Sequence, residues 1–98
     1  MAFKPNQSPT ATNTSVSLNA STFTVLATAD TNRLFFSAAN DTASDAWVSL
    51  STVADATDDT GIFLPAGSVW QMSPDGVYTG EISAISVSGT PAVKICYY

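Results

Sequence analysis

Short runs in which apolar and polar residues alternate, each followed by a polar turn, recur along this chain up to its last residue. Side chains alternate between the two faces of a β-strand, so a two-residue period predicts a strand at each run. No window keeps the helical spacing of apolar residues together with good helix formers. The predicted strands cover residues 16–18, 23–27, 33–39, 46–51, 61–64, 68–73, 81–87 and 92–98.

About eight short strands without a helical crossover predict an all-β fold, namely an antiparallel β-sandwich of jelly-roll or Greek-key type. We expect residues 16–18 and 23–27 to form a hairpin. We also expect residues 88–91 to join the last two strands in a hairpin-like connection. Pro-Ala-Gly at residues 65–67 predicts a tight turn, because proline fixes φ at about −65° and glycine supplies the backbone freedom that the turn needs.

The start of the chain is rich in Pro, Asn, Ser and Thr and lacks a core-facing pattern. We therefore divide the chain into an extended N-terminal arm, residues 1–13, and a β-sandwich domain, residues 14–98. The arm is either a frayed terminus or a segment that becomes ordered against a neighbouring subunit, with Phe3 as its anchor.

Several predicted strands carry apolar side chains on both faces. In residues 33–39, Phe36 and Ala38 share one face, whereas Arg33 and Phe35 lie on the other. A strand that is apolar on both sides is typical of a sheet interior or of a face that meets a partner. The sandwich is thus expected to have two apolar surfaces.

The aromatic residues are numerous for so short a chain. One interpretation places about half of them in the core, following the usual burial ranking. The other assigns them to an interface, since Trp47 and Trp70 each lie on the strand face opposite their most aliphatic neighbours and are expected to point outward. The interface candidates are Phe3, Phe35, Trp47, Trp70, Tyr97 and Tyr98.

Charge narrows the choice of partner. Three Lys and Arg residues stand against eight Asp and Glu residues, for a net charge of −5 at pH 7. This balance disfavours nucleic acid and anionic membranes, and it favours a protein with basic patches. No apolar run has the length of a membrane span or of a signal peptide. We expect a chain that is made and kept soluble in the cytoplasm unless a larger assembly carries it out.

Candidate chemistry is sparse. Without a histidine, the chain has no Ser-His-Asp or Cys-His arrangement. Cys96 is the lone cysteine, and although Lys94 lies on the same strand face, we interpret the thiol as structural. Paired carboxylates would suit a glycosidase, but most of the acids lie in turns, where Asp accepts backbone hydrogen bonds. We predict a protein that is not an enzyme and that has no cofactor.

The longest connection, residues 52–60, is acidic through Asp55, Asp58 and Asp59. Carboxylate oxygens suit calcium, but their spacing does not match an EF-hand loop and the closing Glu is missing. We interpret this segment as a flexible acidic loop and predict no metal, with a bound cation as the alternative.

The order of these elements resembles small β-sandwich proteins of tailed bacteriophage particles, which include capsid decoration or cement proteins and head-fibre-like subunits. The resemblance spans residues 16–98. It rests on NRLFF at residues 32–36 followed by Asn40, AWVSL at 46–50, GIFLPAG at 61–67, GEISAI at 80–85 and GTPAV at 89–93.

The resemblance implies a non-enzymatic virion structural protein that binds the outside of a phage capsid at capsomer junctions and stabilises the expanded shell. It implies the major capsid protein as partner, a homo-oligomer with a trimer favoured, and a place on the capsid surface after assembly in the host cytoplasm. Similar sandwiches occur in tail tips and fibres. The alternative is therefore a carbohydrate- or receptor-binding module of a phage tail or fibre, in which aromatic side chains and Asp-rich loops hold sugar hydroxyls.

Overall fold

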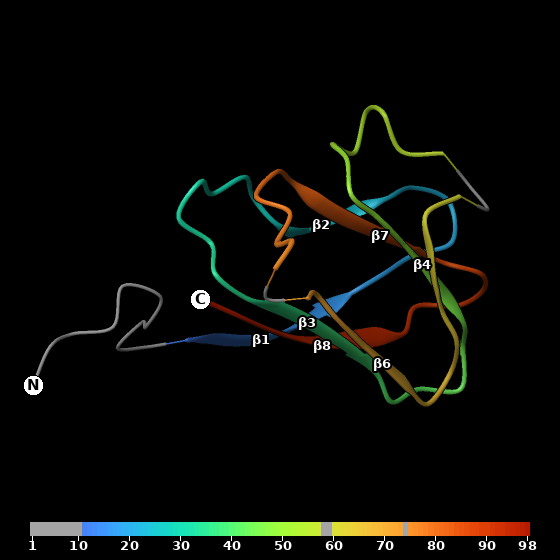
Figure 1. Ribbon diagram of the computed structural model, residues 1–98. Coiled ribbons are helices and arrows are strands. Elements are labelled where there is room, and N and C mark those ends of the chain that lie inside the picture. The colour runs from blue at the N-terminus through green and yellow to red at the C-terminus, as the bar shows by residue number, and fades with distance from the viewer. Residues whose placement is uncertain (1–10, 58–59, 74) are drawn as a thin grey trace, which may run out of the picture.

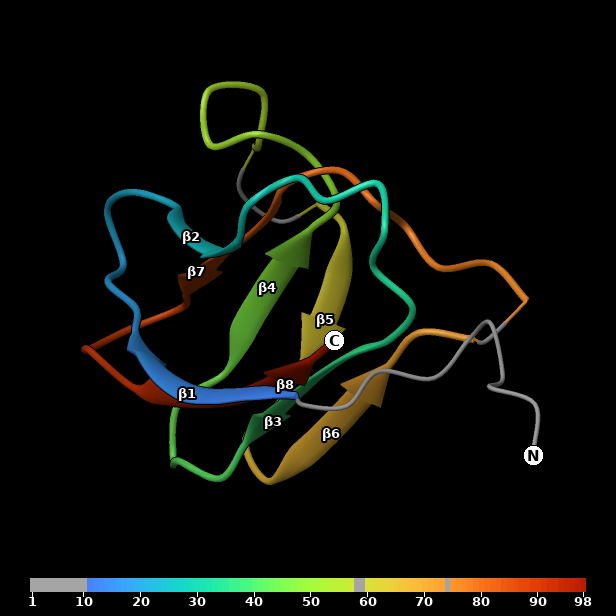
Figure 2. The ribbon, with the colours of Figure 1, turned by 90° about the vertical axis from the view of Figure 1, so that its left-hand side faces the viewer.

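The computed structural model, which describes residues 11–57, 60–73 and 75–98, packs two four-stranded antiparallel sheets face to face (Figures 1 and 2). The predicted all-β sandwich is confirmed, and its jelly-roll or Greek-key subtype stays a prediction. In the part of the chain that the structure describes, no helix is long and apolar enough to cross a membrane. The eight strands are β1 (Thr12–Ser17), β2 (Thr24–Ala27), β3 (Phe36–Asn40), β4 (Ala46–Ser49), β5 (Ile62–Leu64), β6 (Ser68–Gln71), β7 (Ile82–Ser86) and β8 (Ala92–Tyr97).

We name the sheets by their strand orders: sheet A is β1-β8-β3-β6 and sheet B is β2-β7-β4-β5. The chain changes sheet at most of its connections, and β4 and β5 are consecutive strands that do pair. The predicted hairpin of the first two strands is wrong, because β1 pairs with β8 and β2 with β7. The predicted hairpin-like connection of the last two strands is also wrong, because β7 belongs to sheet B and β8 to sheet A. A two-residue period indicates which face is apolar, but it does not indicate which strand lies alongside.

The core lies between the sheets and is built from alternate residues of each strand. Phe36 and Ala38 of β3 are fully buried and face it, as predicted, with Val93 of β8 beside them in sheet A. Sheet B contributes the fully buried Val48 and Leu64, among others. Each large apolar side chain removed from water in this way stabilises the fold by roughly 1.5–3 kcal/mol.

A buried amide joins the sheets at the end of β3. The Nδ2 of Asn40 donates to the carbonyl oxygens of Ser44 (2.7 Å) and of Leu64 in sheet B (3.0 Å). Its Oδ1 accepts hydrogen bonds from the backbone N–H and the hydroxyl of Thr42. The amide group is thus satisfied although the residue is fully buried, as a buried polar group requires.

A buried guanidinium closes the other end. Arg33 lies ahead of β3 and is 4% exposed, so its predicted place within that strand, on the face opposite Phe36, is wrong. Its Nη1 donates to the carbonyl oxygens of Tyr78 (2.8 Å) and Gly80 (2.9 Å), and its Nη2 donates to that of Thr28. Residues 30–33 form a turn in which the Arg33 N–H donates to the carbonyl of Asp30. This turn ends the predicted strand early, so that β3 begins only at Phe36, and it directs the Arg33 side chain into the interior.

Candidate interaction surface

The outer face of sheet B carries a row of apolar side chains that the core does not use. Trp47 on β4 lies directly opposite Phe63 on β5 and Ile85 on β7. The rings of Trp47 and Phe63 are 4.9 Å apart and tilted by 50°, an arrangement typical of attractive aromatic pairs. Phe63 is 45% exposed, whereas Ile85 is only 4% exposed and does not belong to the cluster between the sheets. Neighbours on the outer face therefore cover Ile85.

The row continues onto neighbouring positions of the same face. Val25 on β2 lies opposite Ser83, which is two residues before Ile85, and Val87 lies two residues after it. Both valines are exposed. We call the set of Val25, Trp47, Phe63, Ile85 and Val87 the sheet B patch.

One carboxylate stands at each end of this patch. Glu81 lies just before β7, and the alternation of that strand, continued by one residue, puts it on the outer face at one end. At the other end Asp45 lies beside Val87, whose N–H donates to the Asp45 carbonyl (2.9 Å). Glu81 Oε2 accepts a hydrogen bond from the Val53 N–H (2.9 Å). Asp45 Oδ1 accepts one from the Ala66 N–H (2.8 Å). Backbone donors thus hold both carboxylates in place.

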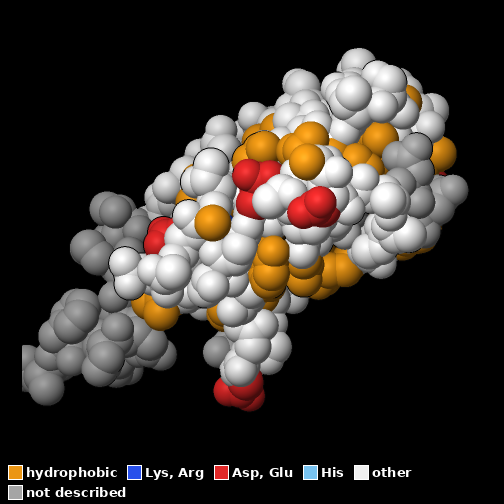
Figure 3. Space-filling view, turned by 90° about the horizontal axis from the view of Figure 1, so that it is seen from above, with side chains coloured by type: hydrophobic (Ala, Val, Ile, Leu, Met, Phe, Trp, Pro, Cys, Tyr) orange, Lys and Arg blue, Asp and Glu red, His pale blue; other side chains and the backbone are white. Residues whose placement is uncertain are grey.

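The described cations are engaged elsewhere. Arg33 is buried among carbonyl oxygens, and Lys94 forms an ion pair with Asp41 at 3.1 Å on the outer side of sheet A. Figure 3 looks at the molecule from the side on which β2 and β7 lie in Figure 1, and among the side chains that the structure describes it shows hydrophobic and acidic groups and no Lys or Arg. The sheet B patch is therefore apolar with an acidic rim.

The outer face of sheet A has a different character. Small and polar side chains, among them Asn13, Ser37, Ala39 and Cys96, line a shallow open groove of about 380 Å³ on it. Lys94 lines the same groove, which confirms that it shares a strand face with Cys96. Its ammonium group, however, lies against both carboxylate oxygens of Asp41 (3.1 and 3.2 Å), and Cys96 is a half-buried free thiol.

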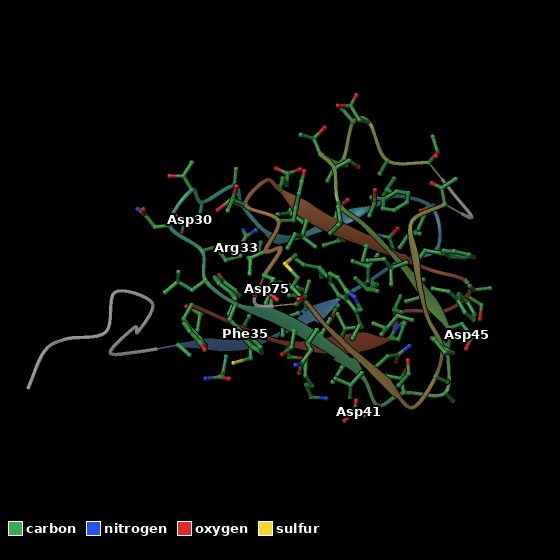
Figure 4. All side chains as sticks on the ribbon, viewed as in Figure 1. Asp30, Arg33, Phe35, Asp41, Asp45 and Asp75 are labelled. Atoms are coloured by element: carbon green, nitrogen blue, oxygen red, sulfur yellow. The ribbon has the colours of Figure 1, made fainter. Side chains whose placement is uncertain are left out.

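A second aromatic pair, of the half-buried Phe35 and the exposed Tyr98, lies at the end of the sandwich. The rings of Phe35 and Tyr98 stack with centroids 5.3 Å apart and an interplanar angle of 19°. Their backbones also pair, since the N–H of each donates to the carbonyl oxygen of the other. Figure 4 places Phe35 near Arg33, at the opposite end of the molecule from Asp45. The structure thus brings together two of the predicted interface residues.

Trp70 points inward, and the prediction that it points outward is wrong. Its ring packs against the core at 6.0 Å from that of Phe36. It lies opposite Ala38, a small residue that leaves room for an indole. Val69, the neighbouring aliphatic residue, faces water and is 68% exposed.

Tyr97 likewise packs against the core, with its ring 6.1 Å from that of Phe36. Phe3, the last of the predicted interface residues, lies outside the described residues. Trp47, by contrast, stands on the outer face of its sheet, where the alternation places it.

Sequence reasoning missed Phe63. The signal was present, because in Ile62-Phe63-Leu64 the alternation puts Phe63 opposite a buried Leu64 and so on the outer face. What the sequence could not show is that β5 pairs with β4, which sets Phe63 beside Trp47.

The acidic connection holds no metal-like arrangement in its described part. Thr52 donates its hydroxyl to Asp55 Oδ2 (3.0 Å), and among residues 11–57, 60–73 and 75–98 no three Cys, Asp or Glu side chains gather closely enough to hold a metal ion. Asp58 and Asp59 lie outside those ranges, so the alternative of a bound cation remains untested.

We compared the chain with family models, with curated proteins and with solved structures, and none of them matches it. On the outer face of sheet B the chain's own residues form an apolar row with a carboxylate at each end.

Proposed function

We propose that this chain is a non-enzymatic virion structural protein that binds the outside of a phage capsid and stabilises it, with the major capsid protein as its partner. The observation that carries the proposal is the sheet B patch. A sandwich needs one apolar layer, between its sheets, whereas here a second apolar row lies on an outer face.

Physical chemistry explains why such a row favours a partner. Trp47 is half-buried and Phe63 is exposed. The area that this aromatic pair still shows to water contributes nothing to the fold, but it contributes to binding when another surface removes it from solvent. Trp is the residue type most enriched among the side chains that dominate binding energy. A surface protein of a shell, which must bind without any chemical step, has use for such a face.

The sequence supports the same assignment. Residues 16–98 resemble phage decoration proteins in the order of their segments, and the polar surface is rich in Ser and Thr. The proposal includes a homo-oligomer, with a trimer favoured, that joins the capsid surface after assembly in the host cytoplasm. It also includes no nucleic-acid and no membrane partner, consistent with the net charge of −5.

A carbohydrate- or receptor-binding module of a tail or fibre is the second candidate. The groove on sheet A favours it, because the Asn13 amide, the Ser37 hydroxyl and the Lys94 ammonium group are suitable partners for sugar hydroxyls. The exposed aromatic rings that would stack on a sugar lie elsewhere, on sheet B and at the end of the sandwich. The first candidate uses those rings directly.

The test is addition of the purified full chain to purified expanded shells that lack a decoration protein. We expect saturable co-sedimentation with the shells, at a fixed ratio to the major capsid protein, and a higher temperature of shell disruption. A chain that stays in the supernatant and leaves that temperature unchanged contradicts the proposal. Binding to a glycan array that is lost in Asn13→Ala and Ser37→Ala variants would instead support the second candidate.

A further inference from the structure

We infer that the sheet B patch docks a partner protein whose contact surface has an apolar centre flanked by two basic side chains. The inference deepens the proposed function. It rests on that function only where it identifies the partner as the phage shell. It adds the face that binds and the chemistry of the surface that it meets.

The shape of the patch follows from the strand register. Phe63, Trp47 and Ile85 form one cross-strand row over three neighbouring strands of sheet B. Neighbouring strands are about 4.8 Å apart, so this row is roughly 10 Å wide.

The two carboxylates set the spacing of the rim. Asp45 lies beside Val87, just after β7, and Glu81 lies six residues earlier, just before β7. At about 3.3 Å per residue, the two acidic groups are roughly 20 Å apart along the strand direction. A partner that satisfies both needs basic groups at a similar separation, one on each side of its apolar centre.

Charge argues against a second copy of this chain as the occupant. Two copies that stack through this face bring carboxylates against carboxylates, and the described cations, Arg33 and Lys94, lie in the interior and on sheet A. Like charges placed across an interface oppose association. A protein with Lys or Arg at the rim replaces this repulsion with attraction.

Each part of the patch then has a distinct effect on binding. Burial of Trp47 and Phe63 supplies affinity and slows dissociation, because aromatic groups at the centre of an interface dominate its energy. Asp45 and Glu81 speed association and make binding sensitive to salt. The two effects can be measured separately.

The experiment begins without any assumption about a shell. A random peptide display library is selected against the biotinylated full chain, and the enriched peptides are then titrated against purified variants. We expect peptides that combine an aromatic or aliphatic side chain with Lys or Arg. Their affinity should fall about thirty-fold in Trp47→Ser and Phe63→Ser, the loss typical of a central interface residue.

Val69→Ser is the matched control, since Val69 is exposed and apolar but lies on sheet A. It should bind the peptides as the unchanged chain does. Phe63→Ser guards against misfolding of the Trp47 variant, because Phe63 is already half in water. The double variant Asp45→Asn, Glu81→Gln keeps an oxygen acceptor for the Ala66 and Val53 N–H groups, and it should flatten the salt dependence of binding.

The same variants are then added to expanded shells, so that the two ideas can fail separately. If the peptides need Trp47 and Phe63 but the unchanged chain ignores the shells, the docking surface stands and the capsid function falls. If shells are bound equally well by the unchanged chain and by Phe63→Ser, the capsid function stands and the docking surface is overturned. A library that yields no binder dependent on Trp47 or Phe63, or only acidic binders, also overturns the inference.

Discussion

The guanidinium group of Arg33 donates a hydrogen bond to the carbonyl oxygen of Tyr78, a residue 45 positions later in the chain. The same side chain also serves Gly80 and Thr28, so one buried cation joins the segment after β2 to the segment before β7. One backbone hydrogen bond, from the Asp30 N–H to the Thr79 carbonyl (2.8 Å), also joins these segments. The guanidinium supplies the donors that the three other carbonyl groups need. Arg33 therefore acts as a structural clamp.

Replacing this clamp should weaken the fold strongly. Arg33→Met keeps the apolar stem but leaves three carbonyl groups without their donor, and we expect a loss of roughly 2–4 kcal/mol in the free energy of unfolding. Arg33→Lys, which keeps the charge but not the forked geometry, should lose about half as much. Urea denaturation followed by Trp fluorescence measures both. Equal stability of all three proteins would show that water replaces the guanidinium.

Asn40 offers a second test, at the opposite end of the sandwich. Asn40→Ala removes the donor to the Leu64 carbonyl and the acceptor for the Thr42 groups, and it leaves these partners buried or half-buried. We expect a loss of about 2–4 kcal/mol by the same measurement. Asn40→Asp should be worse, because its carboxylate would face two carbonyl oxygens without a proton to share. Thr42→Ala, which removes one hydroxyl, is the milder control.

Alanine substitutions at two glycines distinguish the cost of backbone strain from the cost of a steric clash. Gly61 (φ 97°) and Gly67 (φ 81°) both have the left-handed backbone that disfavours other residues. A Cβ at Gly61 would strike the Val48 carbonyl oxygen, whereas one at Gly67 would meet nothing within 4 Å. We expect Gly67→Ala to cost about 1 kcal/mol and Gly61→Ala roughly 2–4 kcal/mol, as measured by thermal unfolding. Similar costs at the two sites would contradict this account.

Adjacent residues on β6 should respond in opposite ways to truncation. Trp70→Ala removes an indole that packs on Phe36 and should destabilise the protein by about 3–5 kcal/mol. Val69→Ala changes a side chain that is 68% exposed, and the effect should stay within roughly 0.5 kcal/mol. Chemical denaturation of the two variants decides whether Trp70 is core or surface.

The alternation in the sequence predicted eight strands and the inner positions of Phe36 and Ala38. It placed the first strand too late, because β1 spans Thr12–Ser17 and begins in residues assigned to the arm. It failed for Trp70, because in a strand with apolar residues on both faces the period does not say which face is the core. It also failed for Arg33, because the predicted strand began at residue 33 whereas β3 begins at Phe36. Both errors concern orientation, which depends on what packs above the strand.

The candidate site was predictable only in part. Trp47 was expected on an outer face, and the structure places it there. Its neighbour Phe63 was not identified, because strand partners depend on contacts between distant parts of the chain. The role of Asn40 was hidden as well, since an Asn beside Asp and Thr is typical of a loop.

The position of β8 has a consequence for how the protein is made. It follows every other strand along the chain, yet in space it lies between β1 and β3. A nascent chain that has been synthesised only through β7 therefore carries β1 without its neighbour, and sheet A has a gap at its centre. Pairings that span nearly the whole sequence, such as Thr12 with Tyr97, also make folding slow. During that interval the unpaired strands are exposed to other copies emerging nearby, which favours aggregation.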